Sequence, residues 1–129
     1  MSRKKSLSLH CPCGLGIDYD ACCGIVHSEH NAISAEALMR SRYSAYTLGL
    51  SNYLLTSWHL STRPKQLNLD TSTQWFKLKI IETQKGKRGD TEGMVSFIAH
   101  YKINGKATRL SEVSEFVFEN KQWFYLGEK

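Results

Sequence analysis

Four cysteines are the residues of this sequence whose type and spacing point most directly to chemistry. They are Cys11, Cys13, Cys22 and Cys23, and all of them lie in the thirteen-residue stretch CPCGLGIDYDACC. A short loop that returns on itself can bring two pairs of thiolates to one point, which is the closed tetrahedral ligand set of structural zinc sites. The spacing therefore predicts one structural zinc ion, with no open coordination position for a catalytic water.

The cysteines alone leave the ion and its full ligand set open. Four thiolates suit iron as well as zinc. His27 and His30 follow the cysteines closely, and each could replace one thiolate as a ligand. Because four thiols already complete a tetrahedron, we expect the cysteines to bind the ion and both histidines to lie outside its ligand set.

The composition fits one folded core and argues against an exported or membrane-spanning protein. With 129 residues, 41% of them hydrophobic, the chain can bury one core of ordinary size. The formal net charge of +5 falls to about +3 once four thiolates bind a divalent ion, so charge says little about nucleic acid. No apolar run follows the basic residues 3–5, and the uncharged stretch 43–62 carries many polar side chains. We therefore expect a cytoplasmic protein with reduced thiols and no membrane insertion.

The segment after the cysteines predicts two helices. The first starts at Ala35, where Ser34 can act as its N-cap, and Gly49 is a suitable end. At about 100° per residue, its apolar stripe contains Ala35, Met39, Tyr43, Tyr46 and Leu50. Ser51 can cap a second, shorter helix, in which one face carries Leu54, Leu55 and Trp58.

From residue 73 onward the hydrophobic period changes to two, which is typical of strands. The alternating runs are 76–80, 95–101, 110–118 and 123–126. In the first run we expect Phe76 to face inward together with Leu78 and Ile80. Asn104-Gly105, between the second and third runs, is the strongest short hairpin signal. The pattern predicts an α+β fold in which helices precede a curved four-stranded antiparallel sheet, with a pocket at its open end.

Glu112 is the exception among the inward-facing positions of the third run. A lone carboxylate in a core is destabilising unless it has a partner. Arg42, beside the apolar stripe of the first helix, is the expected partner, with Arg40 and Arg63 as alternatives. A guanidinium can make two parallel hydrogen bonds to a carboxylate, and such a pair is either a structural salt bridge or the polar part of a ligand pocket.

Two parts of the sequence resemble known families. CPCGLGIDYDACCG is similar to the SEC-C motif, a zinc knuckle of the form Cys-x-Cys-x8-Cys-Cys/His that also occurs at the C-terminus of the SecA translocation ATPase. AEALMRSRYSAYTLGLSNYLLTSWHLSTRP and LSEVSEFVFENKQWFYLGE resemble the bacterial YchJ-like family. The resemblance implies a SEC-C-type knuckle with a basic lead-in over residues 1–30. It also implies a domain similar to nuclear transport factor 2, here called the cone, over residues 31–129.

The resemblance implies zinc at the four cysteines and draws attention to positions around the cone. This candidate pocket set contains Arg40, Arg42, Tyr43, Tyr46, Trp58, His59, Arg63 and Glu112. The sequence departs from the family pattern at Leu60, Ser111 and Lys121, where Pro, His and Gly are usual. The departure at Ser111 speaks against a mechanism that needs a histidine beside Glu112.

Three functions are consistent with these features, and we favour the first. It is a zinc-binding, non-catalytic adaptor whose knuckle and cone recognise a protein partner, as the kinship with the SecA tail suggests, with a possible small-molecule ligand in the cone. The second is an enzyme that acts on a small molecule where Arg42, His59 and Glu112 converge. The third is binding to RNA or the ribosome through the basic residues 3–5 and 85–88.

Overall fold

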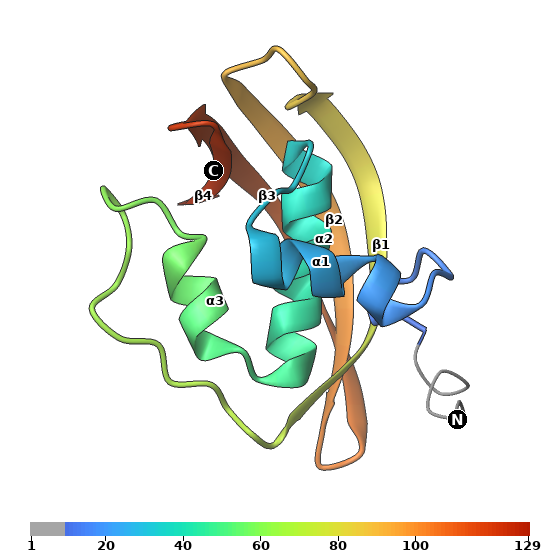
Figure 1. The fold of residues 1–129 in the computed structure, drawn as a ribbon. Helices are drawn as coiled ribbons and strands as arrows, with labels where there is room; N and C mark the ends of the chain where they lie inside the picture. Colours follow the sequence, from blue (N-terminus) through green and yellow to red (C-terminus); the bar gives the residue numbers. More distant parts are fainter. Residues whose placement is uncertain (1–9) are drawn as a thin grey trace.

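Helices lead into a single sheet in the part of the chain that the structure describes, residues 10–129 of a computed structural model (Figure 1). The basic residues 3–5 of the RNA-binding hypothesis lie outside this part. The elements are η2 (Tyr19–Ala21), α1 (Cys23–Glu29), α2 (Ala35–Leu48), α3 (Ser51–Thr56), β1 (Thr73–Lys85), β2 (Glu92–Ile103), β3 (Lys106–Glu119) and β4 (Gln122–Glu128). No helix within residues 10–129 is long and apolar enough to cross a membrane.

The long helix α2 begins and ends where its terminal residues predict. The Ala37 N–H donates a 3.0 Å hydrogen bond to Ser34 Oγ, which acts as the N-cap. Gly49 ends the helix in the left-handed conformation, with φ at 74°. Met39 and Tyr43 from the apolar stripe are buried against the sheet. The predicted helix and its core-facing side are therefore confirmed.

The second predicted helix, α3, is shorter than expected and is not capped by Ser51. Leu50 occupies the N-cap position and Ser51 is the first helical residue. Trp58 lies beyond the helix, in an isolated bridge with Tyr125 of β4. Main-chain hydrogen bonds of 2.8 and 2.9 Å join the segment 57–59 to Tyr125. The extended conformation that this pairing requires explains why the helix stops before Trp58.

The strands form an antiparallel meander in the order β1-β2-β3-β4. Asn104 and Gly105 connect β2 to β3 with φ at 53° and 76°. Asn120 and Lys121 connect β3 to β4 with φ at 53° and 64°. Positive φ at both central residues is the mark of the two-residue hairpin turn that matches the twist of the strands. The α+β fold with a curved four-stranded sheet is confirmed.

A bulge in β1 reverses the alternation predicted for its first half. The pairing with β2 shifts register between Trp75 and Lys77, which leaves Phe76 as an extra residue. Trp75 therefore packs against the core, and Phe76 is 51% exposed. The inward orientation predicted for Phe76 is wrong, although Leu78 and Ile80, beyond the bulge, pack against the core as expected.

The helix α2 lies between the curved sheet and α1 (Figure 1). Its first turn docks on the connection between β1 and β2, where the Ala35 N–H donates a 2.9 Å hydrogen bond to the Gly86 carbonyl. A Cβ on Gly86 would lie 2.7 Å from the Cβ of Ala35, and Gly86 has φ at 78°. Glycine is therefore required at this contact, which fixes the helix along the sheet.

Candidate metal centre and cone pocket

The four cysteine sulfurs meet at one place beside α2. Cys11, Cys13 and Cys23 are buried and Cys22 is half-buried, and all four Sγ atoms lie within 4.8 Å of one another. The Sγ atoms of Cys13 and Cys22 are 3.7 Å apart. A tetrahedron with metal–sulfur bonds of about 2.3 Å has edges of about 3.8 Å, so this spacing fits a bound ion. The four thiols form no disulfide and can hold one metal ion.

The loop between the cysteine pairs folds back through its glycines. The Cys11 N–H donates a 2.8 Å hydrogen bond to the Ile17 carbonyl, and the Gly14 N–H donates one of 3.2 Å to the Cys11 carbonyl. Gly14 and Gly16 have φ at 90° and 79°, which side chains with a Cβ rarely adopt. The chain then enters α1, whose first residue is Cys23. These turns bring the first pair of thiols beside the second.

The four thiols shift one another's pKa values because they lie in contact in a largely buried cluster. A hydrogen bond from Cys13 lowers the pKa of Cys11 far below its ordinary value. The hydrogen bond to Cys11 raises the pKa of Cys23, and burial raises the pKa of Cys22 to about 12. Without a cation the cluster therefore ionises only in part. A divalent ion supplies the charge that keeps all ligands as thiolates, so this donor set fits such an ion.

Two side chains of α2 contact the segment that carries the first pair of cysteines. Ser44 Oγ lies 3.5 Å from the Sγ of Cys11. Arg40 donates from Nη1 to the carbonyl of Cys13 at 2.9 Å and pairs through Nε with Glu36, also at 2.9 Å. Arg40 was predicted as a pocket residue of the cone, but it supports the knuckle instead. The helix α2 thus contacts the knuckle on one side and the sheet of the cone on the other.

His27 is engaged in two hydrogen bonds that keep it away from the thiols. Its Nε2 lies 2.7 Å from the carbonyl of Ser41, which can only accept, so Nε2 carries the proton. Its Nδ1 therefore accepts from the Tyr19 hydroxyl at 2.6 Å. Burial lowers the pKa of His27, in keeping with this neutral form. The ring of His30 lies 5.2 Å from that of Tyr53, and the cluster of candidate ligands in residues 10–129 contains cysteines alone.

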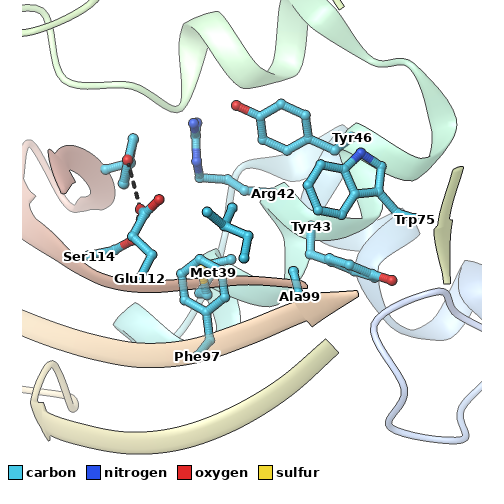
Figure 2. A pocket seen from close by; sticks show the side chains of 11 residues that line it. Met39, Arg42, Tyr43, Tyr46, Trp75, Phe97, Ala99, Glu112 and Ser114 are labelled. Carbon is cyan, nitrogen blue, oxygen red and sulfur yellow. Dashed lines mark hydrogen bonds between the residues drawn. The ribbon is translucent and has the colours of Figure 1, made fainter. Parts of the chain in front are cut away.

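A second candidate site lies between α2 and the sheet, in a pocket of about 100 Å³ (Figure 2). Four residues of the predicted pocket set line it, namely Arg42, Tyr43, Tyr46 and Glu112. Trp75 and Tyr125 also line it and were not predicted. The bulge at Phe76 hides the inward position of Trp75 from a strict alternation, and Tyr125 is one of several aromatic residues in a short last strand.

Arg42 does not pair with Glu112, so the predicted salt bridge is wrong. The guanidinium donates from Nη1 to the carbonyl of Leu54 at 2.8 Å and to Ser57 Oγ at 2.7 Å. Its Cζ lies 4.2 Å from the centre of the Tyr125 ring, which provides a cation–π contact. Burial lowers the pKa of Arg42 from its ordinary value. Arg42 is thus held by main-chain, hydroxyl and aromatic groups.

Glu112 finds its partners in hydroxyl groups. Its Oε2 accepts hydrogen bonds from Ser114 Oγ and from the Tyr125 hydroxyl, the latter at 3.1 Å. Burial raises the pKa of Tyr125, and the neighbouring negative charge of Glu112 adds to that effect. The phenol therefore stays a neutral donor. Tyr125 presents its ring to Arg42 and its hydroxyl to Glu112, and it connects the two groups without an ion pair.

The remaining predicted pocket residues lie outside the pocket lining. His59 donates from Nε2 to Glu119 Oε1 at 2.9 Å, on the surface, while its Nδ1 accepts from the Ser61 N–H. Arg63 donates from Nε to the carbonyl of Trp58 at 2.9 Å. The convergence of Arg42, His59 and Glu112 that the enzyme hypothesis needs is therefore not found, because the partner of His59 is Glu119. The indole of Trp58 packs edge-on against Tyr125.

The basic loop of the RNA-binding hypothesis is a solvent-exposed turn. Lys85, the last residue of β1, is exposed, as are Lys87 and Arg88 in the connection to β2. The Lys87 N–H donates a 3.0 Å hydrogen bond to Asp90 Oδ2, which places an acidic group inside the turn. Binding of RNA or the ribosome stays a prediction.

The sequence of the cone matches a described family. The match is to the family described as "YchJ, middle NTF2-like domain" and covers residues 34–127. The chain belongs to the YchJ-like family. Within it, the chain is 45% identical to a UPF0225 protein of Chromobacterium violaceum, over 98% of this chain and 97% of the relative. It is 41% identical to a UPF0225 protein of Bordetella pertussis, over 98% of this chain and 96% of the relative.

Two solved structures share the fold of this YchJ-like chain. A SEC-C motif containing protein from Rhodopseudomonas palustris has a TM-score of 0.81 and 29% identity, over 94% of this chain and 98% of that one. A SEC-C motif containing protein from Psychrobacter arcticus has a TM-score of 0.78 and 25% identity, over 94% and 81% of the two chains. The predicted family, with its SEC-C motif and NTF2-like cone, is confirmed. The boundary between residues 30 and 31 stays a prediction.

Proposed function

We propose that this YchJ-like protein is a cytoplasmic, zinc-binding adaptor without catalytic activity, and that its knuckle binds a protein partner. The observation that carries the proposal is the closed set of four thiols within 4.8 Å of one another. Four thiolates around zinc leave no position for a water or a substrate, so the ion has a structural role. When bound, zinc supplies folding free energy to the segment that holds it.

The composition of the buried part of the knuckle supports this structural role. Its buried cluster consists of Cys11, Cys13 and Cys23, with Tyr19 and Cys22 packed beside it. So few apolar groups cannot stabilise a fold of this length by themselves. The free thiols are compatible with a reducing compartment, which is the basis for placing the protein in the cytoplasm.

Exposed aliphatic side chains on the knuckle support a protein partner. Leu15 and Ile17, in the loop between the cysteine pairs, are 50% and 44% exposed. Ile25, on α1, is 43% exposed. Exposed apolar residues are common on protein surfaces, and contiguous ones mark contact surfaces. We infer that the partner covers these side chains.

A comparison of purified variants in a cross-linking pull-down tests the proposal. The double variant Leu15→Ser with Ile17→Ser keeps all four cysteines and should retain zinc while losing the partner that the unchanged protein captures. The Cys22→Ser and Cys23→Ser double variant should lose both zinc and partner while the cone stays folded. Leu60→Ser, which alters a leucine that is 77% exposed outside the knuckle, is the matched control and should bind as before.

Retention of the same partner by all variants would exclude the knuckle as the contact. If the Leu15 and Ile17 double variant retains the partner and the cysteine double variant loses it, the contact depends on zinc but lies elsewhere on the knuckle. Circular dichroism and a zinc measurement on each variant separate loss of a contact from loss of the fold.

A further inference from the structure

A buried positive charge in the cone forms no ion pair. Arg42 is 3% exposed, and no carboxylate within residues 10–129 forms an ion pair with it. Its Cζ lies 4.2 Å from the ring centre of Tyr125 and 5.1 Å from that of Trp58. Burying a charge without an ionic partner is destabilising, and such groups are concentrated at binding sites.

One edge of the Arg42 guanidinium makes no hydrogen bond in residues 10–129. Nη1 donates to Leu54 and Ser57, as described above. Nε and Nη2 donate to no acceptor in residues 10–129, and the buried Arg42 side chain lines the pocket. The Nε and Nη2 edge presents two parallel N–H groups, the geometry that binds a carboxylate through two hydrogen bonds.

Glu112 provides a negative charge in the same pocket. Its Oε2 is used by Ser114 and Tyr125, whereas Oε1 receives no hydrogen bond from residues 10–129. Figure 2 shows the Arg42 side chain between Glu112 and the ring of Tyr46, with both charged groups belonging to one pocket. The pocket is therefore lined by a guanidinium with one edge free of hydrogen bonds and by a carboxylate with one oxygen free of them, together with mainly aromatic and aliphatic side chains.

The volume of the pocket limits the size of its ligand. It measures about 100 Å³. A cavity of about 150 Å³ accepts benzene, and sites for drug-sized ligands start at about 300 Å³. The pocket therefore suits a molecule of about five or six non-hydrogen atoms.

We propose that the cone pocket binds a small amino acid as a zwitterion, with its carboxylate on the Nε and Nη2 edge of Arg42 and its ammonium group facing Glu112. A simple carboxylic acid would bring a second negative charge towards Glu112, and a simple amine would leave Arg42 without a counter-ion. Only a ligand with both charges neutralises both groups. This site is separate from the knuckle, so its failure leaves the adaptor proposal untouched.

A titration of the zinc-loaded full chain, followed by amide chemical shifts in nuclear magnetic resonance, tests the proposal. The probes are glycine, L-alanine and β-alanine, with acetate and ethylamine as single-charge controls. At least one amino acid should shift the pocket amides in a saturable way, with a Kd on the order of 1 mM. Acetate and ethylamine should bind at least about tenfold more weakly.

Two conservative substitutions separate the charged contacts from the fold. Arg42→Lys keeps the charge but removes the two-pronged edge, and it should weaken amino-acid binding about tenfold or more. Glu112→Gln should weaken amino-acid binding about tenfold while leaving acetate binding unchanged or stronger. The matched controls are Arg109→Lys and Glu115→Gln, on β3 and outside the pocket lining, and they should bind as the unchanged protein does.

Absence of saturable shifts with all three amino acids would overturn the proposal. Equal binding of acetate and glycine, or amino-acid binding that is unaffected by Glu112→Gln, would overturn the assignment of a zwitterion. Should Arg42→Lys fail to fold, Glu112→Gln together with the single-charge controls still decides the outcome.

Discussion

Arg40 donates a hydrogen bond of 2.9 Å from its Nη1 to the main-chain oxygen of Cys13, which lies 27 positions earlier in the chain. The same side chain pairs through Nε with Glu36, one turn earlier on α2. Its positive charge also lies close to a thiolate cluster that carries a net negative charge when a divalent ion is bound. Arg40 therefore orients the backbone of a candidate metal ligand and connects the knuckle to the cone.

Replacing Arg40 should weaken metal retention without unfolding the cone. In Arg40→Gln the Cys13 carbonyl loses its charged donor, and supporting contacts of this kind typically contribute about 10–100-fold to metal affinity. We expect zinc to transfer to a competing chromophoric chelator at about tenfold lower chelator concentration. Glu36→Gln, which removes only the ion pair on α2, is the control and should retain zinc normally. Equal retention in Arg40→Gln would show that this contact does not support the site.

Arg42 and Glu112 should be only weakly coupled in their contributions to stability, because they form no ion pair and meet only through Tyr125. Glu112→Gln keeps an acceptor for the Ser114 or Tyr125 hydroxyl and should lower the free energy of unfolding by less than about 1 kcal/mol. Arg42→Ala removes the donors to Leu54 and Ser57 and leaves a void, so we expect a loss of about 2–4 kcal/mol.

Urea unfolding of both single variants and the double variant measures their coupling. The predicted interaction energy is about 0.5–1 kcal/mol, the low end of the range for residues that share a contacting group. A buried ion pair would instead give a large loss, about 3–5 kcal/mol, when either partner is removed. Such a result would contradict the observed separation of the two groups.

Ionisation of Tyr53 should lower the stability of the folded protein in alkaline solution. Burial raises its pKa from 10.0 to about 12, and its hydroxyl lies 2.6 Å from Ser41 Oγ. The unfolded chain therefore loses this proton first as the pH rises above 10, so the folded state loses stability between pH 10 and pH 12. The loss attributable to Tyr53 should be on the order of 1–3 kcal/mol across that window.

Tyr53→Phe isolates this contribution. The variant should be about 1 kcal/mol less stable at pH 8, because the hydrogen bond to Ser41 is lost. Its stability should then fall less steeply than that of the unchanged protein above pH 10, since it lacks the phenol whose pKa is raised by folding. Urea unfolding at pH 8, 10 and 11 makes the comparison, and parallel curves for the two proteins would argue against the raised pKa. Tyr43, whose pKa burial also raises to about 12, is common to both proteins and cancels.

The elements that sequence reasoning located correctly are those with local signals. Ser34 and Gly49 define the ends of α2 through capping and positive φ, which depend on a few neighbouring residues. Asn104-Gly105 defines a hairpin for the same reason. The four cysteines lie within thirteen residues at a spacing typical of zinc knuckles, so their convergence could be expected from the sequence.

The errors arose where distant contacts override a local pattern. The bulge at Phe76 depends on pairing with β2, and a strict alternation cannot locate an extra residue. Trp58 leaves the helical pattern because the segment 57–59 pairs with β4, far along the chain. The Arg42 and Glu112 pair was inferred from strand alternation, helical position and opposite charge, and no sequence signal indicated that Tyr125 would contact both.

Metal content and thiol reactivity, measured on protein purified without added metal, test the central claim most directly. We expect one zinc ion per chain by elemental analysis and four cysteines that resist a thiol reagent until a chelator removes the ion. After chelation all four thiols should react, while the far-ultraviolet circular dichroism of the cone sheet persists. Protein that contains no metal and reacts at all four thiols from the start would contradict the account, as would iron in place of zinc.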